Sequence, residues 1–191
     1  MTQARAPRAD AVRNRKKILD AAREQISRHG TEIGMDEIAA AAGVAVGTLY
    51  RHFPNKTDLV AAAAAAHIEG LTAEAEAAAG RVASGARALT EFTSFIEYVV
   101  EACAADHAVN VAALTLGAGS EDKATMQRAT SAVAALVQAG QADGDIHPDV
   151  TAADMFLLFS TAPADRPAAT RARWVALVLS GLITSTRSLE S

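Results

Sequence analysis

The sequence is short of four things: cysteine, proline, aromatic side chains and long apolar runs. Its one cysteine, Cys103, cannot form an intramolecular disulfide, and its apolar neighbours predict a buried, inert thiol rather than a reactive one. There is no stretch of about 18 uncharged apolar residues, and the basic N-terminus lacks the apolar run of a signal peptide. We therefore expect a cytoplasmic protein without a membrane-spanning segment.

Alanine supplies much of the 50% apolar content, and it is the best helix former as well as small enough to pack between close helices. Charged residues make up 21% of the chain, a balance typical of globular rather than disordered proteins. Only five prolines interrupt the chain, and no alternating strand pattern is present. The composition and pattern together predict an all-α fold.

The net charge of −4 hides a division along the chain. Residues 1–60 hold 10 Lys and Arg against 7 Asp and Glu, whereas residues 61–191 hold 8 against 15. The positive charge is therefore concentrated near the N-terminus, and the overall acidity does not exclude a nucleic-acid partner. Taken alone, this excess is weak evidence.

The chain divides into an arm and two helical domains. Residues 1–9 are polar, show no apolar period and carry Arg5 and Arg8, so we expect a flexible basic arm. Residues 10–70 are expected to form an N-terminal domain, and residues 71–191 a second helical domain of a length that can bury its own core.

Apolar residues recur at helical spacing in nine segments. Asn55 is expected to cap the long helix that follows it, Gly80 to lie in a break after that helix, and Ser120 to cap a later one. The nine segments run over about residues 10–29, 35–42, 46–52, 55–79, 89–103, 109–116, 121–139, 151–161 and 168–182.

Residues 34–53, GMDEIAAAAGVAVGTLYRHF, predict two short helices separated by a turn that begins at Gly43. Gly43 can adopt a left-handed conformation at little cost, which lets the two helices meet at a wide angle. The residues expected to pack against the first helix are Ile38, Ala42, Val44 and Leu49. The outer face of the helix over 46–52 is then left exposed, and a single helix fits the major groove of B-DNA. The pattern favours a helix-turn-helix over an ordinary helical hairpin.

The outer face of this second helix carries side chains that suit phosphate. They are Thr48, Tyr50, Arg51 and His52, with Lys56 at the start of the next helix, where the helix dipole also favours an anion. Phosphate contacts position a protein on DNA and make its affinity salt-sensitive. Val46 and Gly47 open the helix, and a valine methyl can meet a thymine methyl without donating a hydrogen bond, so direct base readout from there is limited.

The run from Asp36 to Leu59 resembles the DNA-binding domain of the TetR family of regulators, and the resemblance covers roughly residues 10–70. Its most specific part is Gly-Thr-Leu-Tyr-x-His-Phe-x-x-Lys, residues 47–56. The resemblance implies a homodimer on a palindromic operator of double-stranded DNA. It implies phosphate contacts from Thr48, Tyr50, His52 and Lys56, positions at or near bases for Val46, Gly47 and Arg51, and an arm contact along the backbone or in a minor groove from Arg5 and Arg8.

Two positions depart from the family pattern, which usually has Ser or Thr just before each helix of the motif. Gly34 and Ala45 stand there in this chain. Replacing a hydroxyl cap costs roughly 0.5–2 kcal/mol for Ala and only a few tenths for Gly. We expect the fold to survive and position 45 to offer no hydroxyl to a phosphate.

For the second domain the resemblance implies a ligand pocket and a dimer interface made by the last two helices. Candidates to line a cavity are Phe92, Phe95, Tyr98, Val99 and Met126, and the favoured alternative is that they form the core. The last helix is apolar nearly all round, which suits a four-helix dimer interface. Its candidate interface residues are Trp174, Val178, Leu182 and Ile183.

The sequence contains fragments of enzyme motifs but no complete one. Gly117-Ala-Gly119 begins a phosphate-loop-like pattern without the strand that should precede it, and the Ser120–Lys123 match to S-x-x-K lacks its companion motifs. The five histidines have no metal-binding spacing. We expect no catalytic residues, no metal and no cofactor.

The sequence therefore predicts a ligand-responsive homodimeric repressor. Two alternatives stay open: an activator, since the sign of regulation depends on where the operator lies, and a helical protein-interaction module whose DNA-binding head has lost its sequence preference.

Overall fold

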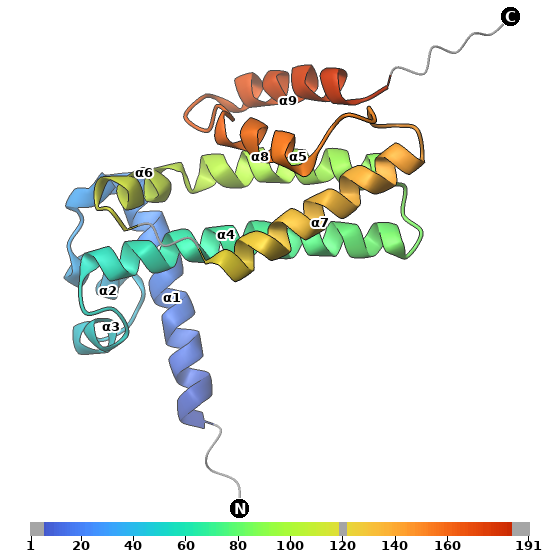
Figure 1. The fold of residues 1–191 in the computed structure, drawn as a ribbon. Coiled ribbons are helices and arrows are strands. Elements are labelled where there is room, and N and C mark those ends of the chain that lie inside the picture. The colour runs from blue at the N-terminus through green and yellow to red at the C-terminus, as the bar shows by residue number, and fades with distance from the viewer. Residues whose placement is uncertain (1–5, 119–121, 185–191) are drawn as a thin grey trace, which may run out of the picture. The chain divides into compact units, whose positions relative to one another are not determined.

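The computed structural model describes residues 6–118 and 122–184, and in that part of the chain all the regular elements are helices apart from one isolated bridge between Ile146 and Ile183. The prediction of an all-α fold with nine helices is confirmed (Figure 1). The helices are α1 (Ala6–His29), α2 (Met35–Ala41), α3 (Val46–His52), α4 (Lys56–Ala83), α5 (Ala88–Ala105), α6 (His107–Thr115), α7 (Lys123–Ala142), α8 (Ala152–Ser160) and α9 (Ala168–Leu182), with a 3-10 turn η1 (Gly30–Glu32) after α1.

Three helix boundaries differ from the sequence-based expectation. Helix α1 begins at Ala6, so residues 6–9 are helical where an arm was expected. Helix α4 runs through Gly80 to Ala83, because a single glycine inside a long helix costs only about 1 kcal/mol. Helix α7 is capped by Asp122, whose carboxylate accepts a hydrogen bond from the Ala124 amide at 3.1 Å, while the expected cap Ser120 lies outside the described residues.

The chain folds into two compact units, and each unit is made of two separate segments of the chain. Unit 1 contains α1, η1, α2, α3, α4 up to His67, and also α6. Unit 2 contains α4 from Ile68 onward, α5, α7, α8 and α9. Residues 71–191 are predicted to form one domain, and within this range α6 contributes side chains to the core of unit 1.

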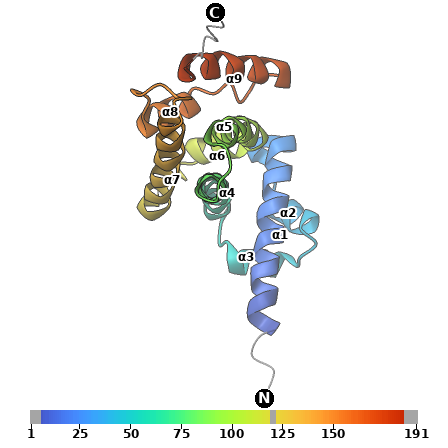
Figure 2. The ribbon, with the colours of Figure 1, turned by 90° about the vertical axis from the view of Figure 1, so that its right-hand side faces the viewer.

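The core of unit 1 is built from one apolar stripe of α1 and the facing residues of its neighbours. Ile18, Ala22 and Ile26 of α1 are fully or almost fully buried, as their spacing of four residues predicted. In Figures 1 and 2, α1 runs the length of the unit beside α2 and α3. Other members of this core are Ile38, Leu49, Phe53, Leu59, Val109 and Ala112, the last two from α6.

A buried charged cluster joins three helices of unit 1. Asp106, which precedes α6, is only 3% exposed. Its carboxylate accepts a hydrogen bond from Arg23 Nε of α1 at 2.6 Å and lies 2.7 Å from His67 Nδ1 of α4. Burial raises the pKa of Asp106, but the hydrogen bonds from His67 and Arg23 outweigh it, so the pKa falls below its usual range. The cluster fixes the start of α6 to α1 and α4.

The core of unit 2 is richer in aromatic side chains. Helix α5 packs against α7 and α9, and α7 packs against α8. Phe95 of α5 meets Phe159 of α8 edge to face, with ring centroids 5.9 Å apart. Gly140 of α7 is required by a close approach: a Cβ there would lie 2.7 Å from Cγ1 of Ile146. Within the described ranges, no helix is both long enough and apolar enough to cross a membrane.

Candidate nucleic-acid interface

The turn between α2 and α3 is built as the sequence predicted. Gly43 has a φ of +64°, a left-handed conformation that favours glycine. Its N–H donates to the Ala40 carbonyl at 3.1 Å, and the Val44 N–H donates to the Ala39 carbonyl at 3.1 Å. This pair of hydrogen bonds ends α2 and satisfies its last carbonyls. The chain is then free to start α3 in a new direction.

The start of α2 keeps the half of a capping box that needs no hydroxyl. The Glu37 carboxylate accepts a hydrogen bond from the Gly34 N–H at 2.8 Å. Ala45, before α3, provides no side-chain cap. The two starts therefore differ, because α2 keeps a side-chain hydrogen bond to its N-cap amide and α3 has no side-chain cap.

Helix α3 has one buried face and one exposed face. Leu49 is fully buried and anchors the helix in the core of unit 1. Val46 and Tyr50 are 40% and 44% exposed, although apolar and aromatic side chains are usually buried. Gly47 and Arg51 are exposed, and Thr48 and His52 are half-buried. The predicted contact residues of α3 are thus all accessible from one surface or its rim.

The start of α4 confirms the predicted cap. Asn55 Oδ1 accepts a hydrogen bond from the Asp58 N–H at 2.8 Å, and Asn55 Nδ2 donates to the Asp58 carboxylate at 2.9 Å. This reciprocal pair satisfies an otherwise unpaired amide of the first turn. It fixes the point at which the chain turns from α3 into α4.

Lys56 has a role that the sequence did not predict. Its ammonium donates hydrogen bonds to the carbonyl oxygens of Thr31 and Ile33, the latter at 2.5 Å. These carbonyls lie in the segment that joins α1 to α2. An ammonium group has three donors, so one remains for the phosphate contact that the sequence predicted. Lys56 ties the start of α4 to the entrance of the helix-turn-helix.

Arg15 of α1 is a second feature that sequence reasoning missed. Its guanidinium carbon lies 4.7 Å from the centroid of the Phe53 ring, at the end of α3. The His52 ring also contacts Phe53, with centroids 6.3 Å apart. No local pattern links residues 38 positions apart, so only the tertiary structure reveals this contact.

The two arginines of the expected arm are not placed by the structure. Arg5 lies outside the described residues, and the side chain of Arg8 is likewise not described. Their contact with DNA stays a prediction.

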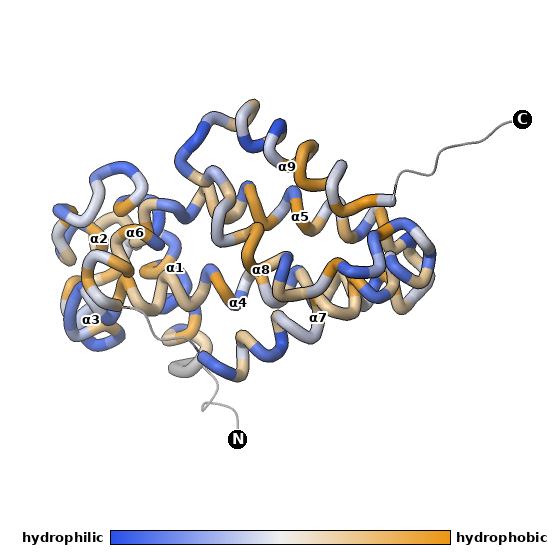
Figure 3. Tube along the Cα trace, turned by 45° about the horizontal axis from the view of Figure 1, so that its top comes forward, coloured by the Kyte–Doolittle hydropathy of each residue, from blue (hydrophilic) through white to orange (hydrophobic). Residues whose placement is uncertain are grey.

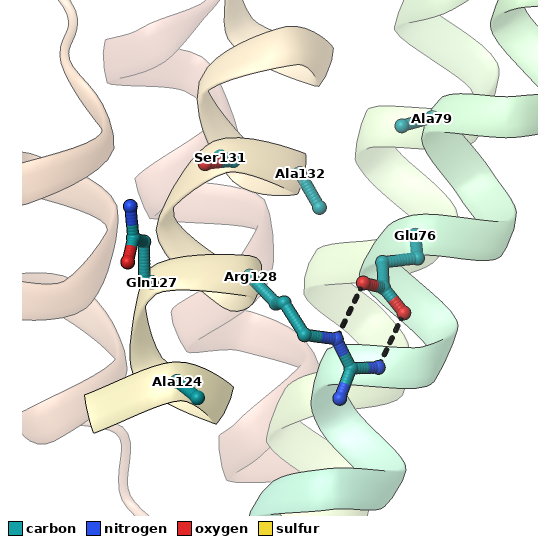
Figure 4. A pocket seen from close by; sticks show the side chains of 7 residues that line it. All are labelled: Glu76, Ala79, Ala124, Gln127, Arg128, Ser131 and Ala132. Atoms are coloured by element: carbon teal, nitrogen blue, oxygen red, sulfur yellow. Dashed lines mark hydrogen bonds and ion pairs between the residues drawn. The ribbon is translucent and has the colours of Figure 1, made fainter. Parts of the chain in front are cut away.

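Unit 2 has an open groove of about 610 Å³ between α4 and α7 (Figure 4). Arg128 of α7 spans it, donating two hydrogen bonds to Glu76 of α4 at 2.7 and 2.8 Å and another to Glu69 at 2.9 Å. The hydrogen bonds from Arg128 lower the pKa of Glu76, and those accepted by Glu76 and Glu69 raise the pKa of Arg128. The remaining lining residues are Ala79, Ala124, Gln127, Ser131 and Ala132.

None of the five residues predicted to bind a ligand lines this groove. Phe92, Phe95 and Val99 are buried in the core of unit 2, which agrees with the alternative interpretation of this set. Tyr98 and Met126 are exposed. A ligand that contacted all five would have to open the core.

The residues predicted for the dimer interface are also divided by the structure. Leu182 is buried within the subunit, and Ile183, which follows α9, pairs with Ile146. Trp174 and Val178 are half-buried and pack against the core of unit 2. Leu182 is thus covered by its own subunit and Ile183 is half-buried, and a place for them in a dimer interface stays a prediction.

The most exposed large apolar side chains of unit 2 are instead two leucines that were not singled out from the sequence. Leu157 of α8 is 65% exposed and Leu177 of α9 is 54% exposed. Figure 3 shows hydrophobic segments in both helices. The exposure of Leu157 could have been predicted from the sequence of α8, AADMFLLFS, which is apolar on more than one face. Singly exposed apolar residues are common on protein surfaces, and only a contiguous patch marks an interaction surface.

The described residues contain no group of three or more His, Cys, Asp or Glu that could hold a metal ion. What unit 1 offers is an exposed short helix with hydroxyl, phenol, guanidinium and imidazole groups, held on a rigid apolar base. Groups of these kinds are able to donate hydrogen bonds to phosphates and base edges, and a single helix fits the major groove of B-DNA.

Two family models match the chain. "Bacterial regulatory proteins, tetR family" matches residues 18–63, and "Transcriptional regulator SbtR-like, C-terminal domain" matches residues 87–184, more than half of the chain. A curated relative, an HTH-type transcriptional regulator of Staphylococcus aureus, is 45% identical over 53 residues, which are 27% of this chain and 29% of that protein. The match thus spans less than a third of the length of such curated relatives.

Solved structures match over nearly the whole chain. The TetR transcription regulatory protein of Mycobacterium vanbaalenii is 29% identical, with a TM-score of 0.72 over 93% of this chain and 99% of that one. A TetR transcriptional regulator of Streptomyces coelicolor is 28% identical, with a TM-score of 0.70 over 90% of this chain and 99% of that one. Family models, fold and exposed α3 agree: the chain belongs to the TetR family of DNA-binding transcriptional regulators, which are not enzymes.

Proposed function

We propose that the protein is a homodimeric repressor that binds a palindromic operator and releases it when a small molecule occupies unit 2. The observation that carries the proposal is the exposed face of α3, where Tyr50 and Arg51 stand outward from the buried Leu49. Two such faces, about one helical turn (roughly 34 Å) apart, read successive major grooves on one side of the duplex.

Contacts divide into those that position and those that read sequence. Thr48, Tyr50 and His52 donate to phosphate oxygens, and Lys56 adds a cation at the start of α4. Arg51 is suited to a guanine edge, because its planar fork donates two hydrogen bonds at once. Val46 packs against a thymine methyl, and Gly47 lets the backbone approach the groove. The arm residues Arg5 and Arg8 lengthen the contact along the backbone or in a minor groove.

Dimerisation is proposed at α8 and α9. Leu157 and Leu177 expose apolar surface, and the half-buried Trp174 and Val178 lie on α9 together with Leu177. In a dimer with twofold symmetry one patch meets its own copy, so a single apolar surface is enough to form the interface. Covering this patch supplies the two-headed arrangement that a palindrome requires.

The effector is proposed to bind in the groove between α4 and α7. Its volume lies in the range of small-molecule sites, about 300–1,000 Å³, and its wall combines small apolar residues with polar Gln127 and Ser131. Helix α4 starts beside α3 and lines the groove further along, so the same helix belongs to both sites. An effector acts only if it binds the DNA-free arrangement more tightly than the DNA-bound one.

The sign of regulation is tested with a reporter gene. An operator selected from random duplexes is placed between a promoter and the reporter, and reporter output is measured with and without the protein. Repression is expected. The measurement is repeated with the operator upstream of the promoter. Higher reporter output in the presence of the protein, at either operator position, would identify an activator and contradict the proposal.

The effector site is tested by screening small molecules for a rise in the melting temperature and then for a loss of operator affinity. Ser131→Trp, which fills the groove, is expected to abolish the response to such a molecule. Gln138→Trp, exposed on the same helix but outside the groove, is the matched control. Molecules that bind without changing operator affinity would rule out the switch.

A further inference from the structure

The N-terminal half of α1 carries a run of cations, and the structure gives them different partners. Arg13 forms an ion pair with Asp10 at 2.8 Å, and Lys16 forms one with Asp20 at 2.6 Å. Arg15 lies between them in sequence and, among the residues that the structure describes, forms no ion pair. Its charge is therefore not offset by a carboxylate of the described chain.

An aromatic ring holds Arg15 instead. The guanidinium carbon lies 4.7 Å from the centroid of Phe53, within the range of a cation–π contact. Phe53 itself is almost fully buried and immobilised by the core of unit 1. Stacking restricts the long arginine side chain but leaves its N–H groups, which point outward in the plane of the guanidinium, free to donate. The side chain is preorganised without being neutralised.

The position of Arg15 connects it with the recognition helix. Phe53 follows directly after α3, and the ring of His52 contacts Phe53 from within α3. Arg15 and His52 thus meet the same aromatic ring at the C-terminal end of α3, although they come from different helices. A cation held there stands beside the surface that carries the other predicted phosphate contacts.

We propose that Arg15, stacked on Phe53, is a positioning residue that binds a DNA phosphate through α1. This inference rests on the DNA-binding function and extends it to a helix outside the helix-turn-helix. A planar guanidinium matches two phosphate oxygens, and stacking removes much of the entropy that a free arginine would lose on binding. The contact carries no sequence information, so it strengthens binding to operator and random DNA alike.

The test measures affinity for a selected operator and for a random duplex over a range of salt concentrations. Arg15→Ala is expected to weaken both roughly tenfold or more and to flatten the salt dependence by about two units per dimer, since each lost phosphate contact removes about 0.9. Arg15→Lys keeps the charge but loses the planar fork. It is expected to keep the slope while still weakening both affinities severalfold.

Arg28→Ala is the matched control. Arg28 lies on the same helix, is exposed, and is paired with Glu24 at 2.6 Å. It stands about 20 Å further along α1, so its loss removes the same charge at a distance from α3. The salt dependence of DNA binding by Arg28→Ala is expected to match that of the unmodified protein.

Coupling to the ring is tested with Phe53→Leu, which keeps an apolar side chain. Arg15→Ala is expected to cost less in that background than alone, because the stacking is already lost. Melting temperatures identify any variant whose fold has changed. If Arg15→Ala is such a variant, Arg15→Lys is used to test whether Arg15 binds a phosphate.

Affinities and slopes unchanged by Arg15→Ala, with operator binding intact in the unmodified protein and in Arg28→Ala, would overturn the role of Arg15 and leave the DNA-binding function standing. Failure of the unmodified protein to bind any duplex would overturn both.

Discussion

The two units differ in what holds them together and in the surface that each presents. Unit 1 uses polar contacts at the ends of its helices, with Lys56 bound to backbone carbonyls and Asp106 bound to Arg23 and His67. Unit 2 has a core that is richer in aromatic side chains. Unit 1 exposes hydrogen-bond donors on α3 and one leucine, Leu114, on α6, whereas unit 2 exposes leucines on α8 and α9. We propose different partners for these surfaces: a polyanion for α3 and an apolar surface for the leucines of α8 and α9.

The largest effect is expected from charging the apolar surface. In the combined variant Leu157→Glu with Leu177→Glu, two carboxylates per subunit would have to be buried without partners, so the dimer should dissociate. We expect monomers by sedimentation and a loss of operator affinity of roughly 10³ or more, down to non-specific binding. Gln138→Glu, an exposed change on α7, is the control and should stay dimeric. A double variant that remains dimeric would show that the interface lies elsewhere.

The second-largest effect is expected from the buried charged cluster of unit 1. Asp106→Asn leaves Arg23 and His67 without the carboxylate and should lower the free energy of unfolding by about 3 kcal/mol, toward the low end for a buried pair because Arg23 is partly exposed. Urea titration measures this change. Glu24→Gln, which breaks the exposed pair with Arg28, should change it by less than about 1 kcal/mol.

The same cluster predicts a pH dependence. The pKa of Asp106 is lowered in the folded protein, so the unfolded state binds the proton more readily. The stabilising contribution is therefore complete at neutral pH and is lost as the pH falls through and below the usual range of an aspartate carboxyl. In Asp106→Asn, this part of the fall in the free energy of unfolding at low pH should be absent. The same pH dependence in the variant and the unmodified protein would argue against a charged Asp106.

Lys56→Ala should lower both the stability of the fold and the affinity for DNA. Loss of the hydrogen bonds to the Thr31 and Ile33 carbonyls should lower the free energy of unfolding by about 2 kcal/mol. Loss of one phosphate contact per subunit should also flatten the salt dependence of DNA binding by about two units per dimer. A lowered stability with an unchanged slope would leave Lys56 with the structural role alone.

Tyr50→Phe should have the smallest effect. Tyr50 is exposed on α3, so its hydroxyl can reach a phosphate without supporting the fold. We expect the affinity for all DNA sequences to fall by about 1 kcal/mol per subunit and the melting temperature to stay the same. Equal affinities for both proteins in a direct titration would remove the Tyr50 hydroxyl from the interface.

The sequence predicted what depends on local order. Helical periodicity identified the nine helices, and the Asn55 cap and the Gly43 turn were found because capping and left-handed backbone involve neighbours a few residues apart. The exposed face of α3 followed from the burial of Leu49 against α1.

The sequence did not predict contacts between distant segments. Arg23 and Asp106 are 83 residues apart, and Lys56 meets carbonyls 23 and 25 residues away. No periodicity encodes such pairs, and for that reason the packing of α6 on the core of unit 1 was not predicted. The burial of Leu182 was missed because a helix that is apolar nearly all round does not reveal which face its own subunit covers.

The most direct test is the selection of random duplex DNA by the purified protein, followed by a salt titration on the selected sequence. The account predicts a palindrome with half-sites about one helical turn apart, bound more tightly than random DNA by roughly 10³ or more. Enrichment of no sequence, with weak and uniformly salt-sensitive binding, would contradict it and point to a protein-interaction module whose head no longer reads DNA.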